Sequence, residues 1–441
     1  MLKDFNDFSR SIHNKCRFDN VMERKGKELS LQTAENDKSK QIPGNQRRKK
    51  HTQMKILHTS DWHLGHTLYN YDRTEEQQAM LEQMVGIVDS EKPDVFLLSG
   101  DVYHTSQPSA NAQTMLSEAL VRIHTACPEM TIVMTAGNHD SPSKHEIFRT
   151  PWRTLNVYAI GQLEKEDMDN HIVEVPGKGY VVAVPYASEH NLPDGFFQQL
   201  LDRVAEQNEE GLPVVLSAHT SVRGCDFTGH DHATELTVGG IDAMDLARMG
   251  EGYDYLALGH IHHEQFVHSG KHNVRYSGTP IPVSFDENYP HSISMVTIDR
   301  HGDTPKVEKI EIENPRPLVT LPTEGFATWD EAKELLADFP ADIPAYIRLN
   351  VEVEGFLQAG AISEAEKLTD GKRCRFCFIN AKRKNDTTSE AKTMTVQEFK
   401  SEEPIEIAKD IAAQKGVPFD DEMTAMFNEA LMKVDEETRN Q

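Results

Sequence analysis

Aspartate, asparagine and histidine residues follow five apolar runs of the sequence, each where the run ends. In chain order they are Asp61 and His63 after residues 56–60, Asp101 after 95–98, Asn138, His139 and Asp140 after 131–135, His219 after 214–216, and His260 and His262 after 255–258. Short apolar runs of this kind predict β-strands. Ligands collect at the carboxyl ends of strands in layered α/β folds, because the loops leave the sheet there. We therefore expect the five groups to meet at one edge of the fold.

The residue types in these groups suit divalent metal ions. Oxygen and imidazole donors without thiolate are typical of manganese, iron or zinc sites. Two aspartates, one asparagine and three or more histidines exceed the needs of one ion, whereas two ions about 3.5–4 Å apart that share a carboxylate would use them all. A single histidine after a strand is more often a surface or hydrogen-bonded core residue than a ligand. Five groups in order instead predict a two-metal centre.

The chain from Met54 predicts the scaffold for these groups. Apolar runs alternate with amphipathic helices, which is typical of an α/β layered fold. One helix is expected around residues 80–88, and another opens at Ser109 as its N-cap. Further strands are expected at residues 181–184, 294–298 and 307–312. Gly100, Gly137 and Gly259 lie beside the candidate ligands and allow the backbone to approach closely there.

Bulk composition sets the class of protein. The 441 residues are 38% hydrophobic, and no apolar run approaches the roughly 18 residues of a membrane span. No segment has the pattern of a signal peptide. We therefore expect a soluble, cytoplasmic protein with no membrane partner. The five cysteines fit a reducing compartment, and the Cys374–Cys377 pair is interpreted as two residues of one strand rather than as half of a zinc site.

Charge is unevenly distributed. The net charge is −25, but residues 1–53 carry 13 Lys/Arg against 7 Asp/Glu, so this stretch holds +6 and the remainder −31. Residues 1–53 are expected to be a disordered basic extension; the alternative is a nucleic-acid-binding arm around residues 46–50. Met54 would then be the natural start. The overall acidity argues against binding to nucleic acid by charge alone.

Three segments follow one another from Met54 onward. Residues 54–315 are the predicted catalytic domain. Residues 316–392 are expected to hold a small α+β unit, with a helix near 329–336 and strands at 345–353 and 374–379, and then a polar linker from Lys382. Residues 393–441 are expected to form two helices. The last has an apolar stripe that includes Met423, Phe427 and Leu431, which would pack either on its own domain or on a partner.

The ordered motifs resemble the calcineurin-like metallophosphoesterases. They are, in order, Asp61-x-His63, Gly100-Asp101, Gly137-Asn138-His139-Asp140, His219 and Gly259-His260-x-His262. Within that superfamily the chain is similar to the SbcD family, the nuclease subunits of bacterial SbcCD complexes. The narrower likeness rests on residues 58–65 (HTSDWHLG), 258–262, 274–282 (VRYSGTPIP) and 284–287 (SFDE). It is strong from Met54 to about residue 315.

The resemblance implies a layered β-sandwich flanked by helices, with two bound cations. One would be held by Asp61, His63, Asp101 and His262, and the second by Asp101, Asn138, His219 and His260, so that Asp101 bridges. It also implies that His139 stabilises or protonates the leaving group and that His104 helps to place the DNA phosphate.

The same resemblance implies a function and its partners. The expected protein is a manganese-dependent DNA exonuclease on duplex ends and endonuclease on hairpins or single strands, active in DNA repair, recombination and replication. Residues 316–392 would contain a DNA-capping domain. Residues 393–441 would bind the coiled coil of an SbcC-type ATPase, in a heterotetramer built on a homodimer of this chain.

Two other classes of function fit parts of the pattern. A protein phosphatase or cyclic-nucleotide phosphodiesterase would share the fold. Protein phosphatases of this superfamily, however, usually carry Gly-Asn-His-Glu, whereas Asp140 follows His139 here. Small phosphodiesterases tend to end soon after the Gly-His-x-His motif, and this chain continues for 179 residues after His262. A non-catalytic scaffold would typically have lost ligands, and none is missing.

Overall fold

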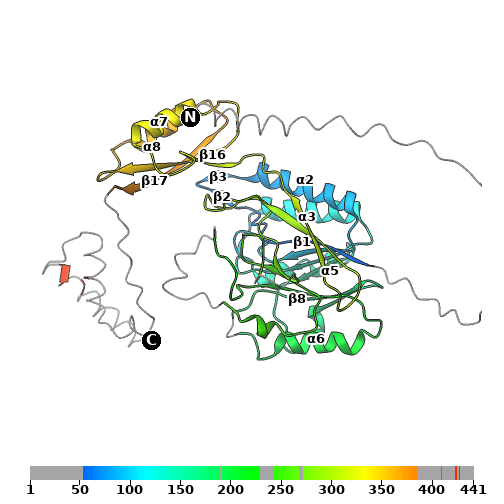
Figure 1. Ribbon diagram of the computed structural model, residues 1–441. Coiled ribbons are helices and arrows are strands. Elements are labelled where there is room, and N and C mark those ends of the chain that lie inside the picture. Colours follow the sequence, from blue (N-terminus) through cyan, green and yellow to red (C-terminus); the bar gives the residue numbers. More distant parts are fainter. Residues whose placement is uncertain are drawn as a thin grey trace, which may run out of the picture. The chain divides into compact units, whose positions relative to one another are not determined.

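The computed structural model describes residues 53–188, 191–228, 243–267 and 272–384, together with Lys409, Met423, Thr424 and Phe427. Two six-stranded sheets dominate these residues (Figure 1). Among the residues described, none of the helices combines the length and apolar character needed to cross a bilayer. The predicted basic extension and the body of the C-terminal helices lie outside the described residues.

The first sheet has the strand order β14-β13-β1-β4-β5-β6. Its strands are β1 (Met54–Thr59), β4 (Val95–Ser99), β5 (Thr131–Thr135), β6 (Val157–Ile160), β13 (Ser292–Ile298) and β14 (Lys306–Glu311). The neighbours β1, β4, β5 and β6 run parallel, and β13 pairs antiparallel with β1. Parallel neighbours end at the same edge, so the loops after β1, β4 and β5 leave the sheet side by side.

The second sheet has the order β11-β12-β10-β9-β8-β7. Its strands are β7 (Ile172–Val175), β8 (Gly179–Val184), β9 (Val214–His219), β10 (Tyr255–Gly259), β11 (Gln265–Phe266) and β12 (Val274–Tyr276). The strands β8, β9, β10 and β12 are parallel. His219 therefore pairs with Gly259, which brings the ends of β9 and β10 together.

The alternation of side chains along each strand builds three apolar layers. Ile56 and Val95 of the first sheet share a buried cluster with Val181, Val215 and other residues of the second, so this layer lies between the sheets. Their sequence neighbours point to the opposite faces. There the first sheet is covered by α2 (Thr74–Glu91) and α3 (Ala110–Ala126), and the second by α6 (Phe196–Gln207). The result is a sandwich with helices on both outer faces.

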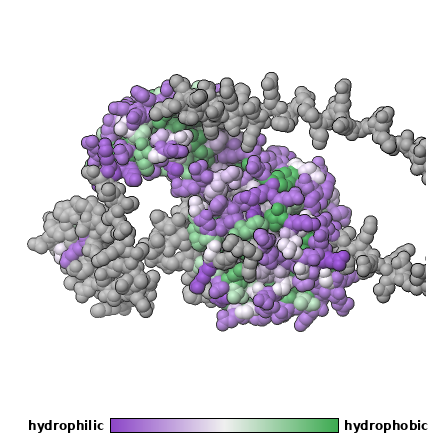
Figure 2. All heavy atoms as spheres, viewed as in Figure 1, coloured by the Kyte–Doolittle hydropathy of each residue, from purple (hydrophilic) through white to green (hydrophobic). Residues whose placement is uncertain are grey.

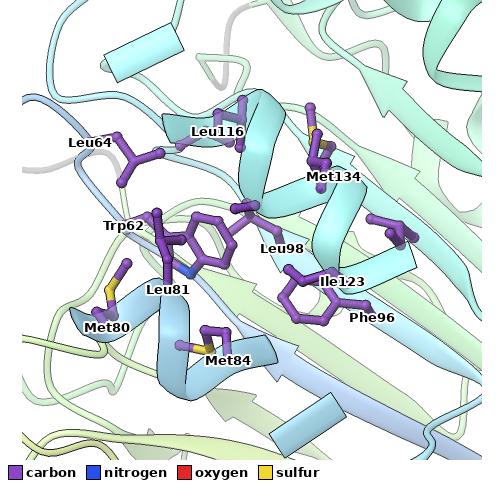
Figure 3. Close-up of a cluster of buried hydrophobic side chains, with 14 of the residues drawn as sticks. Trp62, Leu64, Met80, Leu81, Met84, Phe96, Leu98, Leu116, Ile123 and Met134 are labelled. Carbon is purple, nitrogen blue, oxygen red and sulfur yellow. The ribbon is translucent and has the colours of Figure 1, made fainter. Parts of the chain in front are cut away.

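The layer beneath α2 and α3 also anchors the loop after β1, which carries Asp61 and His63. Trp62 is 1% exposed and lies among Met80, Met84 and Phe96 (Figure 3). Its indole nitrogen donates to Thr59 Oγ1 at 3.0 Å. Burying a side chain of this size contributes about 1.5–3 kcal/mol or more. The loop that carries the residues on either side of Trp62 is therefore held by the hydrophobic core.

Beyond residue 317 the chain forms a three-stranded unit. Parallel strands β15 (Leu318–Leu321), β16 (Tyr346–Val353) and β17 (Arg375–Arg383) alternate with α7 (Trp329–Asp338) and α8 (Ala361–Thr369). This alternation is an α/β arrangement, so the expected α+β unit is corrected in that respect. The expectation missed β15 and α8. It also began the linker at Lys382, whereas β17 continues to Arg383. Cys374 lies just before β17, and Cys377 lies within it.

Short elements complete the described chain. They are β2 (Thr67–Leu68), β3 (Tyr71–Asp72), α4 (Pro142–Glu146), α5 (Arg149–Arg153) and the 3₁₀ turns at Met168–His171 and Leu246–Met249. Every strand expected between Met54 and residue 312 is present, and Ser109 caps α3 by accepting from the Ala112 backbone at 3.2 Å. The visible face is largely hydrophilic, with apolar residues in separate patches (Figure 2).

Small residues let the two sheets approach at the end that carries the candidate ligands. Ser99 Oγ lies 3.0 Å from Ser217 Oγ, and these serines belong to opposite sheets. A Cβ atom at Gly259 would lie 1.9 Å from the carbonyl oxygen of Ser99, and one at Gly137 would lie 2.0 Å from Asp101 Oδ1. A larger residue at either glycine would push the sheets or the carboxylate apart.

We predict that Gly259→Ala lowers the free energy of unfolding by about 1–3 kcal/mol, because the added methyl group meets backbone that cannot give way easily. Gly86→Ala is the matched control. Gly86 lies inside α2 with nothing within 4 Å of an added Cβ atom, so alanine should stabilise by about 0.5–1 kcal/mol. Chemical denaturation of both variants checks this. Equal effects would contradict the close approach of the sheets.

Candidate metal centre

The five predicted groups of ligands meet at one edge of the sandwich. Asp61 reaches across to the second sheet, since both of its carboxylate oxygens accept from the His260 backbone N–H at 3.1 and 3.2 Å. His219 reaches the other way, with Nδ1 donating to the Ser99 carbonyl at 2.8 Å. The sequence therefore placed these residues correctly at strand ends, and the pairing of the two sheets brings them together.

Four of the residues form a first group around two facing imidazoles. Nε2 of His63 lies 3.3 Å from Nε2 of His262, and 3.8 Å from Oδ2 of Asp101. Donor atoms of Asp61, His63 and His262 all lie within 4.8 Å of one another. All four side chains are buried. Buried donors that converge in this way, without apolar side chains between them, fit a divalent cation.

A second group converges on Asn138. Its Oδ1 lies 3.1 Å from Nε2 of His219 and 3.0 Å from Nδ1 of His260. Asp101 Oδ2 lies 3.4 Å from Nε2 of His219, so the same carboxylate borders both groups. Donor atoms of Asp61, Asp101 and His219 also lie within 4.8 Å of one another. The seven predicted ligands thus form two adjacent groups that share Asp101.

Backbone strain is concentrated at this edge. Asp61, His63, Asp101 and His260 have φ angles of 54°, 46°, 49° and 93°. Positive φ is uncommon for residues other than glycine and costs of order 1–3 kcal/mol at each position. Neighbouring hydrogen bonds hold these residues in place, as when the backbone N–H of Asp61 donates to the Gly100 carbonyl at 3.0 Å.

Asp140 is a scaffold residue rather than a member of either group. Its carboxylate accepts from the backbone N–H groups of Val102, Tyr103 and Gly137 at 3.0, 2.9 and 2.8 Å. These bonds join the loops after β4 and β5. The acidic residue in the Gly-Asn-His-Asp motif therefore fixes the relative position of Asp101 and Asn138.

Electrostatics divide the imidazoles into two kinds. Burial alone would lower the pKa of His219, but the nearby Asp101 and Asp61 carboxylates raise it to about 9. Burial likewise opposes protonation of His262, and Glu287 overcomes it, so that this pKa also rises to about 9. Burial holds the pKa of His63 well below its ordinary value. The positive charges of His219 and His262 therefore stabilise the negative charges of the neighbouring Asp101 and Glu287.

His139 and His104 lie together at the border of the first group. Their rings stack with centroids 5.6 Å apart, and His139 Nδ1 donates to the His104 carbonyl at 2.9 Å. His104 Nδ1 lies 3.4 Å from Nδ1 of His63. Both side chains are partly exposed, unlike the carboxylates. Burial lowers the pKa of His104 to about 4, which keeps this imidazole neutral near pH 7.

Three neighbours were not predicted as site residues. Glu287 accepts from His262 Nδ1 at 2.9 Å, and it lies in the SFDE segment that the sequence had singled out without a role. His66 lies with its ring 4.5 Å from that of His104. Tyr186 is 41% exposed, with its ring 6.3 Å from that of His219. Only Glu287 had a sequence signal, because His66 and Tyr186 belong to no motif.

Comparison with known proteins agrees with this geometry. The calcineurin-like phosphoesterase family matches residues 54–264. The SbcD subunit of the nuclease SbcCD from Rhodobacter capsulatus is 30% identical over 312 residues, which cover 63% of this chain and 74% of the relative. The SbcD subunit of Escherichia coli K12 is 26% identical and covers 69% and 79%, and that of Bacillus subtilis is 28% identical and covers 68% and 81%.

Residues 54–264 are therefore a metallophosphoesterase domain, built as a sandwich whose strand ends carry candidate ligands for divalent metal ions. The chain belongs to the SbcD family, named for a subunit of the nuclease SbcCD. It is a metal-dependent nuclease, so the predicted fold class of this domain and the predicted nuclease activity are confirmed. The similarity to nuclease subunits therefore favours a nuclease over a protein phosphatase, a cyclic-nucleotide phosphodiesterase or a non-catalytic scaffold.

The raised pKa values of His219 and His262 predict how the metal-free protein responds to pH. Their folded pKa of about 9 exceeds the ordinary value of 6.5, so this stabilisation is full below pH 6.5 and is lost as pH rises toward 9. The melting temperature of chelator-treated protein should fall over that interval. The double variant His219→Gln/His262→Gln should remove most of the decline. A wild-type melting temperature that rises with pH would contradict the assignment.

Proposed function

We propose that this chain is the DNA-cutting subunit of an SbcCD-type complex, and that it hydrolyses phosphodiester bonds at a centre of two manganese ions. The observation that supports this best is the pair of adjacent donor groups that share Asp101. The primary test compares linear duplex DNA, hairpin DNA and a phosphoprotein as substrates with manganese or magnesium. Cleavage of the phosphoprotein alone would overturn the proposal.

The two groups assign the ligands. Asp61, His63, Asp101 and His262 would hold one ion, and Asp101, Asn138, His219 and His260 the other. The donor set of carboxylate, amide and imidazole suits manganese better than a softer metal, since no thiolate takes part. Two bound cations lower the pKa of a bound water and neutralise charge on the phosphoryl oxygens. His139 and His104 belong to neither set in this assignment.

His139 and His104 would act on the substrate directly. The His104 carbonyl keeps a proton on Nδ1 of His139, so any exchangeable proton of His139 sits on Nε2. A proton there can be given to the sugar oxygen as it leaves. His104, being neutral near pH 7, can donate a hydrogen bond to a phosphate oxygen without adding a charge that would compete with the cations.

The three-stranded unit has features of a DNA-contacting surface. The exposed end of β17 carries Lys382 and Arg383, whose charged groups lie 5.5 Å and 4.9 Å from the ring centres of Phe326 and Phe356. Phe356 is 87% exposed. Cations interleaved with exposed aromatic rings suit the phosphates and bases of nucleic acid. We therefore assign residues 316–392 as a capping domain and linker beside the nuclease domain at residues 54–315.

The partner, the oligomeric state and the substrates are proposed from the similarity to SbcD subunits. The relatives are subunits of SbcCD, so we infer an SbcC-type ATPase as the partner, bound through residues 393–441, in a heterotetramer with two copies of this chain. The activity would be exonucleolytic on duplex ends and endonucleolytic on hairpins or single strands, in the cytoplasm, during DNA repair, recombination and replication. Co-purification with the ATPase, followed by cleavage assays with and without ATP, tests these proposals.

The bridging role of Asp101 predicts a double loss. Asp101→Asn should lower cleavage about 100-fold or more and weaken binding of both ions, because one carboxylate serves two positive charges. Metal content by mass spectrometry and cleavage in manganese measure the two effects. Asp89→Asn, at an exposed carboxylate on α2, is the control and should match the wild type. Full activity of Asp101→Asn would refute the shared-ligand assignment.

The placement of His139 outside both ligand sets predicts a single loss. His139→Gln should reduce turnover by about 100-fold to 10,000-fold, the usual contribution of a general acid, while two ions remain bound. His272→Gln, at an exposed histidine, is the control. Donor atoms of His63, His104 and His139 also lie within 4.8 Å of one another. If the variant binds one ion fewer, His139 is a ligand and its proposed role is wrong.

A further inference from the structure

Glu287 is a buried carboxylate held by several donors. Its side chain is fully buried, and Oε1 accepts from His262 Nδ1 at 2.9 Å. Oε2 accepts from the Thr279 hydroxyl at 3.1 Å and from the Val283 backbone at 3.3 Å. Nε2 of His291 lies 3.7 Å from the same oxygen. An acidic side chain is rarely buried unless it is paired, and here the pairing runs directly to a candidate metal ligand.

His219, the buried imidazole of the other group, has a different partner. Its Nδ1 donates to the backbone carbonyl of Ser99 at 2.8 Å, which carries no net charge. Both partners fix the same kind of tautomer, with the proton on Nδ1 and the lone pair on Nε2. Only Glu287 also adds a negative charge. The two groups therefore differ in the residue that accepts the hydrogen bond from Nδ1 of their histidine, which is a neutral carbonyl for His219 and a carboxylate for His262.

The count of carboxylates adds to this difference. Asp101 borders both groups, and Asp61 lies within 4.8 Å of donor atoms in both. Glu287 is therefore the carboxylate that distinguishes the first group, whereas Asn138 supplies a neutral oxygen to the second. The facing Nε2 atoms of His63 and His262 lie 3.3 Å apart, close enough for one cation to bind both. A carboxylate behind an imidazole makes its Nε2 a stronger donor, and loss of such a partner typically costs 10-fold to 100-fold in metal affinity.

We propose that Glu287 is a positioning residue that makes the cation position at Asp61, His63, Asp101 and His262 the tighter of the two. It acts through His262, whose ring it orients and whose lone pair it strengthens. This inference rests on the ligand sets assigned under the proposed function. The inference adds that the two cation positions bind their ions in a fixed order, the first group before the second.

Glu287→Gln separates this role from a purely structural one. Glutamine has nearly the same shape, and its amide oxygen can still accept from His262. Its amide nitrogen cannot accept from the Val283 backbone as Oε2 does, so some stability should be lost with the charge while the fold persists. Asp286→Asn is the matched control. This neighbouring carboxylate is 66% exposed and pairs with Arg348 rather than with a histidine. Thermal melts of both variants check that each remains folded.

The experiment titrates manganese into the metal-free full chain and follows free and coupled ions by electron paramagnetic resonance. We expect the wild type and Asp286→Asn to bind two ions in sequence, the first at least 10-fold more tightly. In Glu287→Gln the tighter phase should weaken 10-fold to 100-fold while the weaker one changes little. The Glu287→Gln change should have no further effect in a His262→Gln background, because it acts through that ring.

Two outcomes overturn the inference. Tight sequential binding in folded Glu287→Gln would make the residue structural only. Equal weakening of both phases would show a general charge effect rather than an effect through His262. Failure of the proposed function gives a different result, because then the wild type itself would not bind two ions or cut DNA.

Discussion

The close approach of two β-sheets at the ends of their parallel strands is the constraint on which the site depends. Ser99 and Ser217 touch across this gap, and a Cβ atom at Gly259 would collide with the Ser99 carbonyl. The candidate ligands come from the strand ends of both sheets, with Asp61 and Asp101 after strands of one sheet and His219 at the end of β9 in the other. Any widening would separate donors that must face a common cation. Small residues at this edge are therefore needed to keep the candidate ligands together, although none of them is itself a candidate ligand.

Stability for this edge comes from elsewhere in the fold. Four strained residues and several buried charges oppose folding, and each strained residue costs of order 1–3 kcal/mol. The three apolar layers compensate, and Trp62 connects them to the site because it lies between Asp61 and His63 and is buried beneath α2 and α3. Paired charges contribute as well, since Asp101 lies beside His219 and Glu287 beside His262. Cations bound between the carboxylates would relieve the remaining repulsion.

The sequence predicted which residues meet at the candidate site more completely than it predicted the three-stranded unit beyond residue 317, for physical reasons. Asp61 and Asp101 follow strong apolar runs, and a parallel sheet brings such ends together whatever the detailed register. The parallel order of β15, β16 and β17 depends on long-range pairing that no local pattern specifies. By contrast, α6 has a clear helical spacing from Phe196 to Val204, so the expectation missed an element that a local pattern does specify. The pairing of Glu287 with His262 spans 25 residues, so it required the folded chain.

The acidity of the chain affects how the site would attract a phosphate-bearing substrate. A net charge of −25 repels a phosphate backbone at long range, and buried carboxylates add to that repulsion at the site when no cation is bound. Two divalent cations would reverse the local sign, because their four positive charges exceed the charges of Asp61, Asp101 and Glu287 together. Phosphate would then be attracted to the loaded centre and to basic positions such as Lys382 and Arg383. A nuclease with this charge would therefore attract the phosphates of its substrate only after its metal ions are in place.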